Sequence, residues 1–517
     1  MTDRFCDWLY RRRWLLLAGW VVHAFVLHLF VLGFTSWDGL GYRTAPIVEL
    51  VQHGALGTDK YFDYAFAGYV PFVELAHTPF AFVFGLPGFL VGFPLVVFPL
   101  CVCAVYGFAR ELTGTTRGAV IGALAYAALP MYNAEPFGGY VDFAICGALA
   151  FYLFAVLRLR SSPGGWRSFA VVVLASFAFT MSRAQALYVV VLLAPVACYA
   201  AFCERTGWRI RFARRRALAI TAAGTLVGAI PTIAIQLVKL ARYGSPTFPL
   251  QFQVLGWKLG TGLTLADYMH YAGLPDDSWA SQGHAFVQGW LLHRGWPCGF
   301  FDSRFMGAGL VSWLAIALAA VFVRRASRVE RWLVPAFLAV SLLAHDFVHP
   351  RWAYTLALAL VAVVARGLPA LASGGRAARI AFWIGASVLV LHMARPEFDI
   401  VQVRAGAFMP RLNVMRSRYF LKDGLAIQPM PDLDAHFVIV QRPGNGYLLP
   451  LYGKHLTNDV IGTRFQWELG PHCEGLVPLV HIWPNTLYID DDDLTKACAR
   501  ECVVPTRGGC RAYRLLP

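Results

Sequence analysis

The 517-residue chain is 58% hydrophobic and only 15% charged, with a mean hydropathy of +0.53, an apolar content that a water-soluble domain of this size could hardly bury. Its formal net charge is +15, but the Lys and Arg residues stand in short clusters between apolar runs, where they set membrane orientation and argue against a nucleic-acid partner. The composition predicts a polytopic membrane protein.

The first apolar run, residues 14–34, follows Arg11, Arg12 and Arg13. As a helix it would be about 30 Å long, too long for the apolar region of a signal peptide, and no small-residue cleavage site follows it. We expect an uncleaved first span with the N-terminus in the cytoplasm.

Apolar runs predict about eleven membrane spans in an all-α domain that covers residues 1–394. The predicted spans are 14–34, 86–109, 117–131, 138–158, 167–181, 185–203, 217–240, 307–323, 332–345, 352–366 and 378–393. Basic connections follow every second span, so the positive-inside rule places them in the cytoplasm. The long connections 35–85 and 241–306 are then on the outer side.

Prolines interrupt the approach to the second span and predict a kinked or re-entrant segment. They are Pro71, Pro79, Pro87, Pro94 and Pro99.

Residues 395–517 have the composition of a small soluble domain. Short strands are predicted at 436–440, 447–451 and 486–490, separated by turn sequences. We expect an α/β or mainly β domain of about 120 residues outside the cytoplasm, since it follows the eleventh span.

Asp38 is a lone acid at the start of the first outer connection. The residues after it predict an interfacial helix that includes Tyr42 and Arg43 and is stopped by Gly54 and Gly57. The apolar residues of this helix are Ile47, Val48, Leu50 and Val51. Asp38 fits two roles equally well: accepting a proton or positioning a reacting group at the membrane rim, or capping the helix.

Asp142 lies just inside the predicted fourth span, and Glu135 and Tyr140 precede it at the outer surface. An acid at this depth is costly and is expected to face the bundle interior with a partner. Arg183 stands in the tight turn between the fifth and sixth spans. Its planar guanidinium suits a phosphate, and the alternative is that it simply pairs with Asp142 or Asp38.

The segment AHDFVHPRWAY places His345, Asp346, His349 and Arg351 at an outer helix end. The first three could bind a divalent metal, but no fourth ligand is evident, and hydrogen bonding to a phosphate or sugar is favoured.

Cysteines in the C-terminal domain are candidates for two disulfides, because disulfides persist outside the cytoplasm. They are Cys473, Cys498, Cys502 and Cys510.

Five local motifs resemble those of the GT-C superfamily of integral membrane glycosyltransferases, in particular the bacterial branch that contains the lipid A aminoarabinose transferase and relatives of the protein O-mannosyltransferases. The motifs are SWDGLGY with Asp38, GYVDFAICGALAF with Asp142, SRAQAL with Arg183 and Gln185, YGSPTFPLQF, and HPRWAYTLAL with His349 and Arg351.

This resemblance implies an inverting transfer of a sugar from a polyprenyl-monophosphate donor to a lipid, glycan or protein acceptor at the outer face of a bacterial inner membrane. Asp38 and Asp142 would be the catalytic acids. The substrate-binding residues implied are Tyr42, Arg43, Glu135, Tyr140, Arg183, Gln185, His345, His349 and Arg351. No cofactor would be required, although His345, Asp346 and His349 leave a divalent cation open.

A different class also fits the composition: a non-catalytic transporter of lipids or lipid-linked oligosaccharides, or a membrane scaffold. Transport predicts charged residues along a continuous path and often repeated halves. The chain has no internal repeat, and the candidate site residues Asp38, Asp142, Arg183 and Arg351 all map to the outer side, which favours catalysis.

Overall fold

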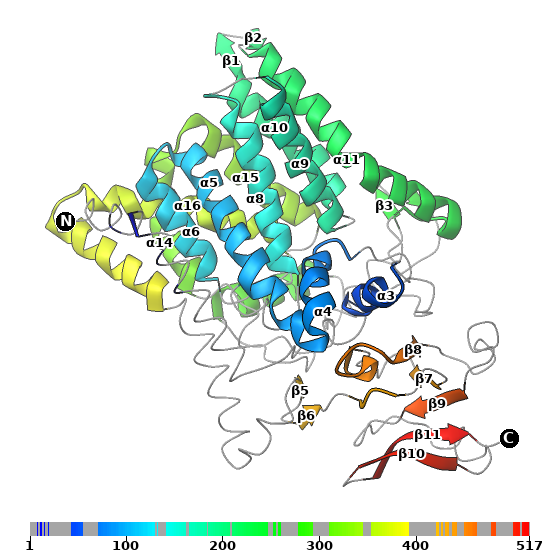
Figure 1. Cartoon of the computed structure of the whole chain (residues 1–517). Helices are drawn as coiled ribbons and strands as arrows, with labels where there is room; N and C mark the ends of the chain where they lie inside the picture. Colours follow the sequence, from blue (N-terminus) through cyan, green and yellow to red (C-terminus); the bar gives the residue numbers. More distant parts are fainter. Residues whose placement is uncertain are drawn as a thin grey trace. The chain divides into compact units, whose positions relative to one another are not determined.

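The structure is a computed structural model of the 517-residue chain (Figure 1). The residues that it describes are 43–54, 71–129, 141–161, 165–183, 185–206, 209–212, 214–246, 252–254, 257–259, 278–292, 310–344, 353–391, 420–422, 425–427, 430–433, 437–441, 449–462, 477–481, 500–506 and 509–515, with Trp8, Arg11, Arg12, Leu15, Gly19 and Tyr132.

The chain divides into two compact units, and each is made of several segments. The first contains Met1–Val26, Pro94–Pro136 and Val141–Gly406; the second contains Leu27–Phe93, Phe137–Tyr140 and Ala407–Pro517. The second unit therefore groups the first predicted outer connection with the C-terminal segment. The expected boundary between residues 394 and 395 stays a prediction.

The first unit is a bundle of apolar helices. Its labelled helices are α5 (Phe98–Thr113), α6 (Thr116–Ala127), α8 (Asp142–Arg158), α9 (Trp166–Ser182), α10 (Ala186–Phe202), α11 (Arg215–Tyr243), α13 (Trp279–Phe286), α14 (Leu310–Arg325), α15 (Arg328–Ala344) and α16 (Tyr354–Ala372). Residues 376–391 are also helical. Short hairpins pair β1 (Cys203–Thr206) with β2 (Arg209–Phe212) and β3 (Phe252–Val254) with β4 (Trp257–Leu259), and a π-helix, η5 (Val287–Leu292), follows α13.

Helices coincide with each predicted span from 86–109 to 378–393. Three stretches of the described chain are long and apolar enough to cross a membrane, namely Leu86–Thr113, Arg215–Ala241 and Tyr354–Ala372. The first predicted span lies outside the described residues except for Leu15 and Gly19, so the total of eleven stays a prediction.

Small residues let the helices approach closely, as is usual where no hydrophobic effect drives helix association in lipid. A Cβ on Gly122 would lie 2.6 Å from the Cβ of Ala109, and one on Gly228 would clash with the carbonyl oxygen of Val173. Helix α5 therefore packs closely against α6 at Gly122, and α9 packs closely against α11 at Gly228 (Figure 1).

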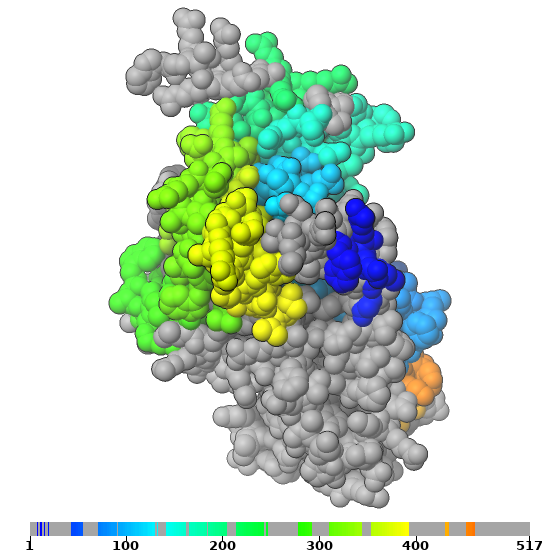
Figure 2. Space-filling model, turned by 90° about the vertical axis from the view of Figure 1, so that its left-hand side faces the viewer, coloured from blue at the N-terminus to red at the C-terminus, as the bar shows by residue number. Residues whose placement is uncertain are grey.

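Exposed apolar side chains cover the outer surface of several helices. Figure 2 shows residues 376–391 in yellow beside the green surface of the preceding helices, and Gly385 packs against Leu314 of α14 and Leu368 of α16. Exposed apolar residues here are Ile316, Val323, Ile380, Ile384 and Leu391. Such a surface suits contact with lipid.

Four of the basic connections predicted to share one side meet at one end of the bundle. Arg158 Nη1 donates to Glu111 at 2.9 Å, and Arg366 bonds both Glu330 and the carbonyl oxygen of Leu112. These contacts join four connections and confirm their common end. The cytoplasmic assignment of that end stays a prediction.

The second unit contains short helical segments and strands. Its helices are α3 (Ala45–His53), η2 (Glu74–His77), α4 (Thr78–Phe84), η3 (Leu86–Leu90) and η9 (Leu449–Tyr452), and the π-helix η4 (Gly92–Val97) leads from it into α5. These breaks confirm that prolines interrupt the approach to α5. The helix predicted after Asp38 is α3, which ends at Gly54 in a left-handed conformation, φ 69°.

A five-stranded mixed sheet forms the C-terminal part of this unit. Its order is β10 (Arg500–Thr506), β11 (Gly509–Leu515), β9 (Val477–His481), β7 (Phe437–Gln441) and β8 (Asp459–Gly462), with β7 parallel to both neighbours. Strands β5 (Phe420–Lys422) and β6 (Leu425–Ile427) form a separate hairpin.

One strand prediction is wrong. Residues 449–451 of the strand predicted at 447–451 belong to the 3₁₀-helix η9, because Pro450 has a fixed φ and no N–H to donate to a sheet. The strand predicted at 486–490 lies outside the described residues, and the helical part of the expected α/β domain stays a prediction.

Candidate functional site

Asp142 opens helix α8. It lies in the first turn, directly after the N-cap residue Val141, and is 1% exposed. The helix dipole favours a negative charge at this end, but a buried carboxylate still needs a partner that offsets its lost hydration.

Arg183 supplies that partner from the turn between α9 and α10. It is the residue after Ser182, its backbone is extended, and α10 begins at Ala186. Its Nη1 donates to Asp142 Oδ1 at 3.0 Å, and its Nε donates to Gln185 Oε1 at 3.1 Å. The structure thus brings together three predicted site residues.

The two sides of this ion pair differ in exposure. The side chain of Asp142 is 2% exposed, whereas that of Arg183 is 22% exposed. The buried carboxylate of Asp142 therefore holds the guanidinium of Arg183, part of which stays accessible. This arrangement can orient the guanidinium to bind an anionic group such as a phosphate.

Aromatic side chains fix the start of α8. The hydroxyl of Tyr126 donates to the carbonyl oxygen of Phe143 at 2.6 Å, and Phe98 packs against both rings. Tyr132 packs on Tyr126 in turn. Because these rings are buried, Asp142 has little freedom to leave Arg183.

A polar face of α11 runs along α9 toward Arg183. Ser176 donates to the carbonyl oxygen of Thr225 at 2.9 Å, and Thr232 donates to Thr180 at 3.0 Å. Gln236 and Lys239 follow at helical spacing on the same face, and both are buried.

Sequence reasoning missed Lys239 as a candidate site residue. Lys239 falls inside the predicted span 217–240, one residue before its end. A lysine inside an apolar run is costly and is by default a functional candidate, so the signal was present.

In the second unit, Arg43 forms a buried ion pair with Glu74. Its Nη1 lies 3.1 Å from Glu74 Oε1, and the two side chains are 10% and 1% exposed. The pair fixes the residues just before α3 against η2. A contact between Arg43 and substrate stays a prediction.

Helix α3 also contacts residues far along the sequence. Gln52 Nε2 donates to the carbonyl oxygens of Leu456 at 2.6 Å and Asn458 at 2.9 Å, and the hydroxyl of Tyr452 donates to Glu49 Oε1 at 3.3 Å. These bonds place α3 against η9 and the residues that lead into β8.

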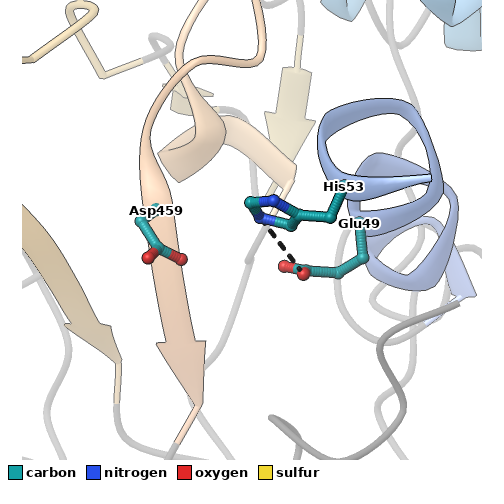
Figure 3. Close-up of side chains that lie close together, drawn as sticks. All are labelled: Glu49, His53 and Asp459. Carbon is teal, nitrogen blue, oxygen red and sulfur yellow. Dashed lines mark ion pairs between the residues drawn. The ribbon is translucent and has the colours of Figure 1, made fainter. Parts of the chain in front are cut away.

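The same contact forms a cluster suited to a divalent cation. Figure 3 shows Glu49 and His53 of α3 facing Asp459 of β8, and one ligand atom from each lies within 4.8 Å of the others. Within the described residues this is the group that could hold a metal. Sequence reasoning missed it, since no local motif joins its members.

The remaining predicted site residues lie outside the described residues. They are Asp38, Tyr42, Glu135, Tyr140, His345, Asp346, His349 and Arg351. The N-cap of α3 is Thr44, so the capping role considered for Asp38 does not apply to that helix.

Among the disulfide candidates, Cys473 and Cys498 also lie outside the described residues. Cys502 lies on β10 and Cys510 on β11. The pairing of the four cysteines stays a prediction.

Comparison with solved structures shows the fold. The chain superimposes on ArnT from Cupriavidus metallidurans bound to undecaprenyl phosphate with a TM-score of 0.55 and 13% identity, covering 98% of each chain. The apo form of that ArnT gives a TM-score of 0.52 and 14% identity over 96% of this chain and 98% of that one.

An Archaeoglobus fulgidus oligosaccharyltransferase, tethered to an acceptor peptide with an NVT sequon, matches with a TM-score of 0.50 and 13% identity over 89% of this chain and 65% of that one. No family model and no curated protein sequence matches the chain. Both structural neighbours are GT-C glycosyltransferases. The chain therefore shares the fold of these two structures, as the resemblance to the GT-C superfamily predicted. Three stretches of its described residues are long and apolar enough to cross a membrane.

Proposed function

From this shared fold, we propose that the chain is a membrane glycosyltransferase that moves a sugar from a polyprenyl-monophosphate donor to an acceptor at the outer face of a bacterial inner membrane. The observation that carries the proposal is the Asp142–Arg183 ion pair at the helix ends. The ArnT neighbour, which has this fold, is bound to undecaprenyl phosphate.

Arg183 would bind the donor phosphate. As the bond between the anomeric carbon and the phosphate oxygen breaks, negative charge grows on the departing lipid phosphate, and a fixed guanidinium stabilises it. The bonds to Asp142 and Gln185 hold the fork in place beforehand, so little reorganisation is needed during the reaction. Lys239 would add a second cation from α11.

Asp38 would position the acceptor and take its proton. The acceptor oxygen or nitrogen attacks the anomeric carbon from the face opposite the phosphate, the new glycosidic bond forms, and the acceptor's proton passes to the carboxylate. This displacement inverts the anomeric configuration. Because the leaving group is a lipid monophosphate, the step requires no metal to neutralise a diphosphate.

The acceptor is a cell-envelope lipid, glycan or protein, and the transferred group is a hexose or pentose. The alternative of a transporter or scaffold has no need of an acid that accepts a proton at the membrane rim. The two classes therefore differ in what the loss of Asp38 does.

The test compares cells that carry the wild-type chain with cells that carry Asp38→Asn, by mass spectrometry of lipids and glycans. We expect a polyprenyl-phosphate sugar to accumulate and one defined glycan mass to disappear. Asp59→Asn, which removes another acid from the same predicted connection, is the control and leaves the profile unchanged. An unchanged profile in Asp38→Asn, at wild-type protein level, would reject the proposal in favour of transport.

A further inference from the structure

Glu49, His53 and Asp459 form a cluster that the proposed transfer reaction does not use. Glu49 and His53 lie one turn apart on α3, with Glu49 Oε2 3.7 Å from His53 Nε2, and Asp459 begins β8. All three belong to the second unit. We propose that they bind a Zn²⁺ ion that fastens α3 to β8.

The donor set favours zinc. One imidazole nitrogen and two carboxylates are ligands typical of Zn²⁺, with a fourth position left for water, whereas Ca²⁺ and Mg²⁺ prefer oxygen ligands only. Ligand atoms around tetrahedral zinc are roughly 3.3 Å apart, given bonds of about 2.0 to 2.1 Å. The three atoms, which lie within 4.8 Å of one another, need only small side-chain adjustments to reach that geometry.

The site is supported from behind. Glu49 is 1% exposed, and its Oε1 accepts a hydrogen bond from the hydroxyl of Tyr452, which is itself fully buried. This leaves Oε2 directed at His53. Hydrogen bonds that orient a ligating carboxylate are a regular part of metal sites.

Electrostatics points the same way. The cluster places two carboxylates close together, and like charges at this separation disfavour each other. A divalent cation among them removes that repulsion. The alternative is an ordinary helix ion pair between Glu49 and a protonated His53, which contributes little at a position where His53 is 51% exposed.

A bound zinc ion would also stabilise the packing of α3 against β8. Gln52 already bonds the backbone at Asn458, 406 residues away in the sequence. A metal beside that contact would close a very long loop and favour the docked arrangement of α3.

The experiment uses the purified full-length chain in detergent, stripped of metal with a chelator and then titrated with Zn²⁺ alone. Calorimetry measures affinity, metal analysis after dialysis counts bound zinc, and thermal unfolding with and without Zn²⁺ measures stabilisation. We expect about one zinc per chain and a higher unfolding midpoint. Replacing His53 by Ala should weaken binding at least about 10-fold, and Tyr452→Phe should weaken it by about 10-fold.

The matched control is His455→Ala. His455 forms a second exposed His–Asp pair in this unit, 2.6 Å from Asp432, but belongs to no three-ligand cluster in the described residues. Replacement of His455 should leave zinc affinity unchanged.

Because His53 is half exposed, replacement of His53 should not disturb folding. Asp459→Asn offers a second test of the site. The proposal is rejected if the wild type takes up no stoichiometric zinc, or if His53→Ala binds zinc as tightly as the wild type.

Discussion

Arg183 Nη1 donates to Asp142 Oδ1 at 3.0 Å, linking the turn after α9 to the first residue of α8. The same guanidinium is held from its other edge by Gln185. The ion pair has two roles: Arg183 compensates the buried charge of Asp142, and Asp142 positions the guanidinium of Arg183. The first role predicts effects on stability, and the second predicts effects on activity.

Replacing Arg183 alone should lower the free energy of unfolding more than replacing Arg183 and Asp142 together. Arg183→Ala leaves the buried carboxylate of Asp142 without its compensating cation, which costs about 3 to 5 kcal/mol. Adding Asp142→Asn removes that charge and should restore part of the loss. Thermal unfolding in detergent of the two single variants and the double variant gives the coupling energy, expected at about 1 to 3 kcal/mol. Additive effects would show that the two side chains do not interact.

For activity, Arg183→Lys should keep the charge but lose the forked geometry. We expect turnover to fall by about 10²-fold or more, as for removal of one preorganised donor, while the unfolding midpoint changes less than in Arg183→Ala. Turnover is followed by release of polyprenyl phosphate from the donor. Wild-type turnover in Arg183→Lys would mean that only the charge matters.

Lys239 should contribute to donor binding through its charge. Lys239→Met keeps the length and apolar stem of the side chain but removes the ammonium, so we expect weaker donor binding, by about 10-fold or more. Lys239→Arg is the matched control and should retain most of the affinity. If the Met variant binds donor normally, Lys239 has a structural role only.

Gly85 should tolerate no side chain. Its φ is 64°, and a Cβ there would lie 2.6 Å from the carbonyl oxygen of Lys454, the same oxygen that accepts a bond from the N–H of Leu86. Gly85 also has a ψ of −142°, a combination that residues with a Cβ rarely adopt, whereas Gly54 has φ 69° and ψ 9°, in the left-handed helical region, and nothing within 4 Å of its added Cβ. Gly54→Ala should therefore lower the free energy of unfolding only by the conformational strain, about 1 to 2 kcal/mol. Gly85→Ala should lower it clearly more. The unfolding midpoints of the two variants and the wild type measure the difference. Equal costs would show that neither the close contact nor the unusual backbone conformation limits Gly85.

The turn around Asp432 should lose stability in acid. Partial burial alone raises the pKa of Asp432, but hydrogen bonds from the ring and backbone of His455 and from Thr457 outweigh it and lower the pKa below its usual 3.8. A group with a lowered folded-state pKa contributes stability above its unfolded pKa and loses it as pH falls through the folded value. Unfolding midpoints measured from pH 6 to pH 3 should fall less steeply in Asp432→Asn than in the wild type. Identical slopes would mean that Asp432 is not responsible.

Local properties of the sequence are enough to predict the helical bundle and the contact between Asp142 and a cation. Apolar runs of span length place α9 and α10 nearly to the residue, and the few residues between them force a tight turn at Arg183. The cost of an acid at the start of an apolar run then predicted that Asp142 needs a cation. Both inferences depend on hydrophobic run length and on charge, which are properties of short segments.

Contacts between residues far apart in the sequence could not be predicted in this way, because they depend on how the helices and strands pack. Pro450 lies in a 3₁₀-helix rather than a strand, and Lys239 belongs to a polar face because α11 packs along α9. The cluster of Glu49, His53 and Asp459 joins α3 to β8. No spacing rule connects residues some 400 positions apart, because their proximity results from chain folding and from contacts such as Gln52 with Asn458.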